Sequence, residues 1–208
     1  VIENPIDIPK DKMIINIGRF FAGGHNKKQD VLVKAFIEMS DNRWAEGWRL
    51  ILVGRKHADE ASQRHIRFLE EIAKGYPIEF RYDTSSGELE SLLERAKIYW
   101  HATGYDEVSN LNPEKFEHFG LATIEAAQYG AVPVVFNAGG QPEIINHAQN
   151  GMLWNTTDEL IHYTKLLMEN VSMWKNFSRA AFDSTNTFVK EKQFRWFVLF
   201  LSSYYEFR

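Results

Sequence analysis

Short apolar runs alternate with longer stretches of helical period along most of this chain. Five runs are almost continuously apolar and a weaker sixth follows them: 13–18, 49–54, 78–82, 97–102, 132–136 and 151–154. Strands that helices cover on both faces have this character, because neither face meets water. The alternation predicts stacked strand–helix units, and hence an α/β fold with a parallel sheet of about six strands flanked by helices.

The segments between the apolar runs carry helix signals. In 29–40 the apolar residues recur at i, i+1, i+4, i+5 and i+8, which forms one buried stripe on a helix. Residues 59–74 continue in the same way and end at Gly75, a favoured C-cap residue. A short helix is predicted at 86–96, with Ser86 as its N-cap.

The chain divides into three predicted parts. Residues 1–12 are extended and punctuated by proline, which is typical of a linker, so we expect an excised domain. The main domain is predicted to span 13–186. It includes a helix from about Gly120 to Gly130, and the chain is predicted to be helical from Thr156 onwards, ending in a C-terminal helix at 187–208.

Composition limits the classes of function. The chain has 208 residues and a net charge of -4, so it offers no broad basic surface for nucleic acid or an anionic membrane. It has no cysteine, which excludes disulfides and thiol metal sites, and its histidines show no metal-ligand spacing. Without a signal peptide or a long apolar span, the sequence predicts a cytoplasmic, metal-independent protein.

Cations gather after the first two predicted strands. Arg19, Lys27 and Lys28 follow the first strand, and Arg55, Lys56 and His57 follow the second. Because ligands of open parallel sheets bind at the carboxyl ends of the strands, both clusters face one rim. The plain alternative is that these side chains are solvated surface charges.

Two glutamates stand eight positions apart in the segment EHFGLATIEAAQYG. On one continuous helix Glu117 and Glu125 would lie about 80° apart, which does not suit an acid–base pair. If the helix begins near Gly120, Glu117 lies on the loop before it and Glu125 on its second turn. Helix amino termini bind anions and carboxylates accept hydrogen bonds from sugar hydroxyls, so the segment favours a nucleotide-sugar ligand.

Several of these residues have simpler interpretations that stay open. Gly139 and Gly140 could form only a turn, and Glu125 alone could be an exposed helix residue. His101 is either a buried core histidine or a residue that faces the ligand.

The segment EHFGLATIEAAQYGAVPVVFNAGGQPEII resembles the signature of retaining glycosyltransferases of the GT-B fold, the glycosyl transferases group 1 family. The similarity extends upstream through IGRFFAGGHNKKQDVLVKAF and RLILVG. Such enzymes have two Rossmann-like halves with the active site between them. The resemblance implies that this chain is the carboxyl-terminal, donor-binding half, and that 1–12 is a remnant of the interdomain linker.

The resemblance also implies roles for individual residues. Arg19 and Lys27 would hold the donor diphosphate, with Lys28 as an alternative to Lys27 because the intervening loop is longer than usual. Glu117 would orient hydroxyls of the transferred sugar, and Glu125 would accept from the ribose. The expected contacts to phosphate, sugar and base come from Phe119, Gly120, Leu121, Arg81 and Tyr82, the last two within a base site at 81–84.

The implied activity is transfer of a hexose from a nucleotide diphosphate sugar to an acceptor hydroxyl, with retention and without a further cofactor. GDP-linked mannose is slightly favoured over UDP-linked sugars. The acceptor would bind an N-terminal domain missing from this chain, toward which helix 187–208 would pack, so the chain alone is predicted to be inactive. Membrane contact would be indirect and peripheral, through a lipid-linked acceptor of the full-length enzyme.

A different class of function is a non-catalytic interaction domain that keeps this fold. It is suggested by the aromatic run at 188–204, which carries more aromatic surface than one helix face can bury. Joint retention of Arg19, Lys27, Glu117 and Glu125 favours catalysis. A phosphorylase of the same fold has less support, because no context for a cofactor lysine is present.

Overall fold

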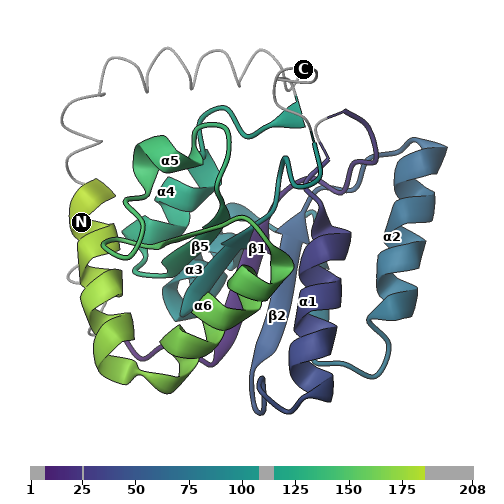
Figure 1. The fold of residues 1–208 in the computed structure, drawn as a ribbon. Helices are drawn as coiled ribbons and strands as arrows, with labels where there is room; N and C mark the ends of the chain where they lie inside the picture. The colour runs from purple at the N-terminus through teal and green to yellow at the C-terminus, as the bar shows by residue number, and fades with distance from the viewer. Residues whose placement is uncertain (1–7, 25, 108–114, 186–208) are drawn as a thin grey trace.

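The computed structural model describes residues 8–24, 26–107 and 115–185. Six parallel strands form one sheet in the order β3-β2-β1-β4-β5-β6, flanked by helices on both faces (Figure 1). This confirms the predicted Rossmann-like architecture. The strands are β1 (Met13–Ile17), β2 (Arg49–Gly54), β3 (Ile78–Tyr82), β4 (Ile98–His101), β5 (Val132–Phe136) and β6 (Met152–Trp154).

Helices cover the two faces of the sheet in separate layers. The helices are α1 (Gln29–Asp41), α2 (Glu60–Ile72), α3 (Ser86–Arg95), α4 (Leu121–Gln128), α5 (Gln141–Ile144) and α6 (Thr157–Glu169), with a further helical stretch at 171–185. Buried residues of α1, α2 and α6 share one apolar cluster, whereas those of α3, α4 and α5 share the other.

Successive side chains of a strand contribute to the two apolar clusters in turn. In β1, Ile14 packs toward α1 and α6, whereas Met13 and Ile15 pack toward α3 and α4. In β4, Trp100 and Tyr99 divide in the same way. Successive side chains of a strand point to opposite faces, so a strand that is apolar at every position is buried from both sides.

Some helix ends differ from the predictions. Ser85, not Ser86, caps α3: its hydroxyl accepts from Glu88 N at 3.3 Å, and the Glu88 carboxylate accepts from Ser85 N, which makes a capping box. Helix α2 ends at Ile72, before Gly75, which adopts a left-handed φ of 84° in the turn that follows.

The helical carboxyl-terminal part is also interrupted. Helix α6 ends at Glu169, and Asn170 adopts an extended conformation before the stretch 171–185 begins. The predicted helix at 187–208 and the first seven residues of the predicted linker lie outside the described residues. Of the remaining linker residues, Lys10 donates to the backbone carbonyls of Glu94 and Tyr129, which ties this segment to the carboxyl ends of α3 and α4.

The strand order reverses direction at β1 and β4. From this point the chain winds outward both ways, and such a switch point opens a crevice at the carboxyl ends of the strands. Only Ile14↔Ile98 and Ile15↔Tyr99 pair between the two strands. Beyond them the Asn16 side chain donates from Nδ2 to the Trp100 carbonyl at 2.9 Å, so β1 and β4 stay joined where their backbones separate.

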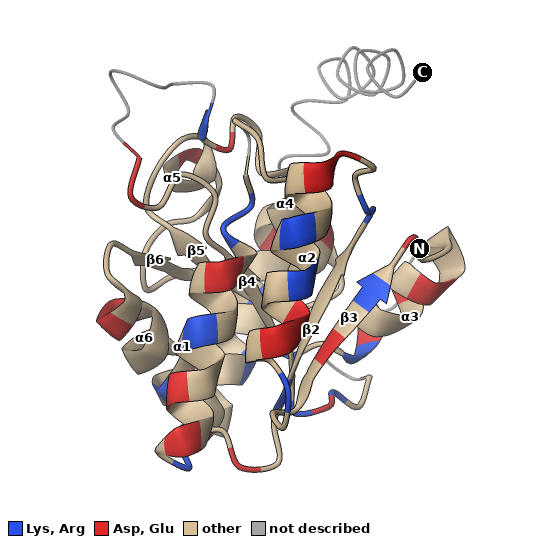
Figure 2. Cartoon of the chain, turned by 90° about the vertical axis from the view of Figure 1, so that its right-hand side faces the viewer, with Lys and Arg blue, Asp and Glu red and all other residues tan. Residues whose placement is uncertain are grey.

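Charged residues of both signs are interspersed on the outer helices. Figure 2 shows blue and red residues following one another along α1 and α2. Lys34 pairs with Asp30 at 3.1 Å on α1, and Arg64 pairs with Glu60 at 2.5 Å on α2. Within the described ranges, no helix combines the length and apolar character that crossing a bilayer requires.

Candidate functional site

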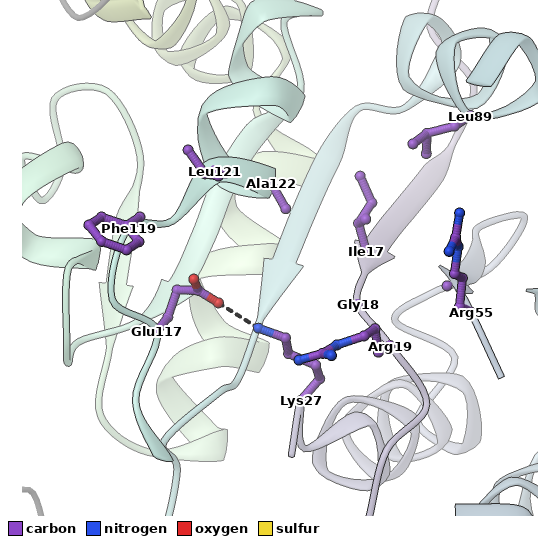
Figure 3. Close-up of a pocket in the computed structure, with 11 residues that line it drawn as sticks. Ile17, Gly18, Arg19, Lys27, Arg55, Leu89, Glu117, Phe119, Leu121 and Ala122 are labelled. Atoms are coloured by element: carbon purple, nitrogen blue, oxygen red, sulfur yellow. Dashed lines mark hydrogen bonds and ion pairs between the residues drawn. The ribbon is translucent and has the colours of Figure 1, made fainter. Parts of the chain in front are cut away.

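A cavity of about 550 Å³ opens at the carboxyl ends of β1 and β2 and reaches the loop before α4 (Figure 3). It brings together side chains from five separate segments: Ile17, Gly18, Arg19, Lys27, Gly54, Arg55, Leu89, Glu117, Phe119, Leu121 and Ala122. Five of these are residues for which the sequence predicts a role: Arg19, Lys27, Glu117, Phe119 and Leu121.

The exit of β1 is held in place from two sides. Gly18 N donates to the Val53 carbonyl at 2.9 Å, and Gln29 Nε2, fully buried at the start of α1, donates to the Arg19 carbonyl at 3.0 Å. An added Cβ on Gly54 would lie 1.9 Å from the Gly18 carbonyl oxygen. Only glycine at position 54 permits this approach, which puts Arg19 and the residue after Gly54 side by side.

Lys27 and Glu117 form the central ion pair of the cavity. Lys27 Nζ donates to Glu117 Oε2 at 2.6 Å, and the two side chains are 15% and 18% exposed. His101, buried at the end of β4, places Nε2 3.6 Å from the same carboxylate oxygen. The Gly120 N–H donates to the other oxygen at 3.4 Å. This carboxylate thus accepts hydrogen bonds from Lys27 and Gly120, and a carboxylate can accept hydrogen bonds from ligand hydroxyls in the same way.

Lys28 takes a different direction from Lys27. Its Nζ donates to Glu107 Oε1 at 2.9 Å, and Lys115 Nζ donates to Glu107 Oε2 at 2.9 Å. These hydrogen bonds, first that from Lys115, lower the pKa of Glu107. Of the two lysines left open by the sequence, Lys27 lines the cavity and Lys28 does not.

The amino end of α4 is directed toward the cavity. Gly120 precedes the helix in a left-handed conformation (φ 61°) and, being glycine, supplies no capping side chain; its own N–H donates to the Glu117 carboxylate. Leu121 and Ala122 of the first turn line the cavity. Because the first turn of a helix presents N–H groups and a partial positive charge, this end can accept an anion.

Gly139 and Gly140 support the loop that carries Glu117. Gly140 N donates to the Glu117 carbonyl at 2.7 Å. Added Cβ atoms on Gly139 and Gly140 would lie 2.2 Å from the carbonyl oxygen of Glu117 and 2.3 Å from that of His118. The glycine pair is therefore more than a turn, since its lack of side chains lets the loop after β5 lie directly under the loop of Glu117.

Glu125 lies one turn deeper along α4 than the cavity-lining residues. It follows Ala122 by three positions and Leu121 by four, which places it on the same side of the helix. Burial raises the pKa of Glu125, and no hydrogen bond or ion pair joins it to another described residue. Burial, and to a smaller extent the charges of Glu117 and Glu125, raise the pKa of Tyr99, which is fully buried in β4.

Arg81 and Tyr82 lie on the rim but do not line the cavity. Arg81 pairs with Glu79 at 2.5 Å, and the Tyr82 hydroxyl donates to Glu70 at 2.8 Å. Lys56 Nζ lies 3.8 Å above the centre of the Tyr82 ring. Arg81 is thus paired with Glu79 on β3, whereas Tyr82 contacts Glu70 of α2 and Lys56.

Comparison with known proteins identifies the family. The sequence profile of the glycosyl transferases group 1 matches residues 2–184. This chain is a member of that family. The family assignment agrees with the GT-B resemblance predicted from the glutamate segment.

Two curated relatives are mannosyltransferases. The chain is 27% identical over 190 residues to "GDP-Man:Man(3)GlcNAc(2)-PP-Dol alpha-1,2-mannosyltransferase" of Dictyostelium discoideum, covering 88% of this chain and 35% of that protein. It is 28% identical over 134 residues to the protein of the same name from Mus musculus, covering 62% and 24%. The chain thus spans about a third or less of these relatives.

Solved structures share the fold. The C-terminal domain of the glycosyl transferase group 1 family protein LpcC from Francisella tularensis superposes with a TM-score of 0.66 at 18% identity, over 86% of this chain and 87% of that one. HepE of Anabaena, solved in complex with UDP and glucose, gives a TM-score of 0.67 at 17% identity, over 88% and 45%. The first match shows that this fold exists as a separate carboxyl-terminal domain in another member of the family.

Sequence patterns did not reveal all of the residues that shape the site. Ala122 of α4 and Leu89 of α3 line the cavity. The sequence could not show this, because the order of the strands decides which helices lie side by side. Glu107 had no motif to mark it, since its two lysine partners come from separate segments. The supporting role of Gly139 could be suspected only from its position beside the glutamate segment.

Proposed function

We propose that this chain is the donor-binding half of a retaining glycosyltransferase, which moves a hexose from a nucleotide diphosphate sugar to an acceptor hydroxyl. The observation that carries this proposal is the convergence of Arg19, Lys27 and Glu117 in one cavity at the switch point of the sheet. Two cations, a carboxylate and an open helix end are complementary to a sugar joined to a diphosphate.

The chemistry follows from the positions of these groups. Arg19 and Lys27 hold the diphosphate and offset the charge that develops on it as the sugar departs, the task that a metal ion performs in other transferases. Glu117 accepts hydrogen bonds from hydroxyls of the sugar, and its donors keep the carboxylate oriented. The acceptor attacks from the face of the departing phosphate, which takes the acceptor's proton, so configuration is retained.

Glu125 is proposed to bind the ribose. Its carboxylate has no hydrogen-bond partner among the described residues, so ribose hydroxyls can donate to it in place of water. The stretch from Glu117 to Glu125 then spans the sugar, the diphosphate at Gly120 and the ribose in order along the donor.

A mannosyl donor is proposed on the strength of the curated relatives, whose names contain GDP-Man. Their names also include a dolichol-linked acceptor. By analogy the acceptor of the full-length enzyme would be lipid-linked, its binding would fall to a further domain, and the enzyme would work in the cytoplasm at the membrane surface. The 208-residue chain alone would then bind donor without transferring sugar.

The alternative function, a non-catalytic interaction domain, rests on the aromatic run at 188–204, which lies outside the described residues. No contact within the described part of the chain favours it over donor binding.

The test is binding of GDP, UDP and their sugars to the 208-residue chain, measured by calorimetry and thermal shift. We expect at least one nucleotide to bind, and the double variant Arg19→Ala/Lys27→Ala to lose that binding. The matched control Lys34→Ala/Arg64→Ala removes the same charge from the outer faces of α1 and α2 and should bind normally. Absence of binding by the unaltered chain at millimolar concentrations would refute the proposal.

A further inference from the structure

The end of the cavity opposite Glu117 is formed by Arg55 and Leu89, which have no assigned role so far. In Figure 3, Arg19 and Lys27 lie between Glu117 on one side and Arg55 on the other. Arg55 directly follows β2, and Leu89 belongs to the first turns of α3. The cavity thus has a carboxylate end, a cationic middle and an end that combines a guanidinium group with an apolar side chain.

The backbone of Arg55 is fixed next to that of Arg19. Phe20 N donates to the Arg55 carbonyl at 2.9 Å, and Phe20 and Lys56 form a parallel bridge beyond the ends of their strands. Gly54 lies so close to the Gly18 carbonyl oxygen that no side chain fits at position 54. Arg55 is exposed and lines the cavity, so a ligand that occupies the cavity can reach it.

The order of groups in a nucleotide diphosphate sugar matches the order of groups in the cavity. The sugar, the two phosphates, the ribose and the base follow one another in a line. With the sugar at Glu117, the phosphates at Arg19 and Lys27 and the ribose at Glu125, the base extends toward α3 and the end of β2. The base then lies between Leu89, which can cover one of its faces, and Arg55, which can reach its edge.

A guanidinium group distinguishes between bases by the acceptors they offer. It carries five N–H donors in a planar fork and no acceptor. Guanine presents O6 and N7 side by side, and the two-pronged hydrogen bond of arginine to this pair is the commonest specific contact of arginine with a base. Uracil has an N–H between its two carbonyl oxygens, so it offers the fork one acceptor at a time.

Resting on the proposed function, we infer that Arg55 selects a guanine nucleotide as donor by hydrogen bonding to O6 and N7 of the base. This places base recognition on Arg55 and Leu89 at the cavity, rather than on Arg81 and Tyr82. Arg81 donates to Glu79 on β3, and the Tyr82 hydroxyl donates to Glu70 on α2.

The test is the ratio of the dissociation constants for GDP and UDP, measured by calorimetry on the 208-residue chain at one fixed salt concentration. The unaltered chain should bind GDP more tightly. Arg55→Gln should weaken GDP about tenfold or more, the size of a two-pronged arginine–guanine contact, and leave UDP nearly unchanged. Arg55→Lys keeps the charge but loses the fork, and should lose the preference as well.

The control variant is Arg64→Gln, which removes an exposed cation from the outer face of α2 and should leave the GDP/UDP ratio unchanged. Equal weakening of GDP and UDP by Arg55→Gln would assign Arg55 to the phosphates and overturn the inference. Preference for UDP by the unaltered chain, or an unchanged ratio in Arg55→Gln, would also overturn it while leaving donor binding intact. Absence of binding to both nucleotides would instead refute the proposed function itself.

Discussion

Lys27 and Glu117 are 90 positions apart in the chain, yet Lys27 Nζ lies 2.6 Å from Glu117 Oε2. Lys27 comes from the loop after β1, and Glu117 from the loop after β4, so the pair bridges the crevice at the switch point. Each charge compensates the other in the absence of donor. The proposed donor would offer new partners to both groups, its phosphates to Lys27 and its sugar hydroxyls to Glu117.

Lys27→Met is expected to weaken GDP binding about tenfold or more, because it removes a charge-assisted hydrogen bond from a mostly buried position. Lys28→Met should change the affinity less than about fivefold, as for a surface ion pair. Calorimetric titration of both variants decides between the two lysines. A larger loss in Lys28→Met would assign the diphosphate to Lys28 instead.

Gly139→Ala should destabilise the domain by about 1–3 kcal/mol and weaken donor binding, because the new methyl group meets the Glu117 carbonyl oxygen and strains a left-handed backbone. Gly87→Ala is the control: nothing lies within 4 Å of its added Cβ. Since Gly87 is in α3, this change should stabilise by up to about 1 kcal/mol. Denaturant unfolding measures the stability of both variants. If Gly139→Ala were as stable as the unaltered chain, the loop after β5 would have to move away from the Glu117 carbonyl.

Glu125→Gln should make the unliganded domain more stable at neutral pH. Burial raises the pKa of Glu125 above its ordinary 4.5, so the folded state holds the proton more tightly than the unfolded state does. Stability from this group is therefore complete below pH 4.5 and is lost as the pH rises through the folded-state pKa.

The same substitution should weaken nucleotide binding, because an amide is a poorer acceptor for ribose hydroxyls than a carboxylate. Thermal unfolding at several pH values, with and without GDP, separates the two effects. A gain of about 1 kcal/mol would raise the melting temperature of a chain of this size by about 2–4 °C. Lower stability of Glu125→Gln at neutral pH would contradict the inference that burial of the charged carboxylate destabilises the unliganded domain.

Glu107→Gln should show the opposite pH dependence. The hydrogen bonds from Lys115 and Lys28 lower the pKa of Glu107 below its ordinary 4.5, so its contribution to stability is present above pH 4.5 and lost as the pH falls through the folded-state pKa. The difference in stability between the unaltered chain and Glu107→Gln should thus shrink on acidification. A constant difference across this range would show that the two lysines do not act through the carboxylate charge.

Much of the fold could be predicted because it depends on local patterns. Continuous apolar runs located the strands within a residue or two, since strands buried on both faces need apolar side chains at every position. The convergence of Arg19, Lys27 and Glu117 followed from the single rule that parallel strands end at one edge.

Features that depend on distant contacts could not be predicted. Both Ser85 and Ser86 are possible N-caps of α3. Which of them caps the helix depends on the path of the chain between β3 and α3. The direction of Lys28 is decided by Glu107, 79 positions away. Likewise, Gly54 is needed because its backbone lies against the Gly18 carbonyl, and no local sequence pattern shows this contact.

The short pairing between β1 and β4 has a mechanical consequence. Two residue pairs and the Asn16 amide join one half of the sheet to the other, whereas five residue pairs join β1 to β2. A donor that touches Arg19 on one half and Glu117 on the other would act as a staple across this seam. Its binding should slow amide hydrogen exchange in β1 and β4 more than in β3, so the seam would report occupancy of the site.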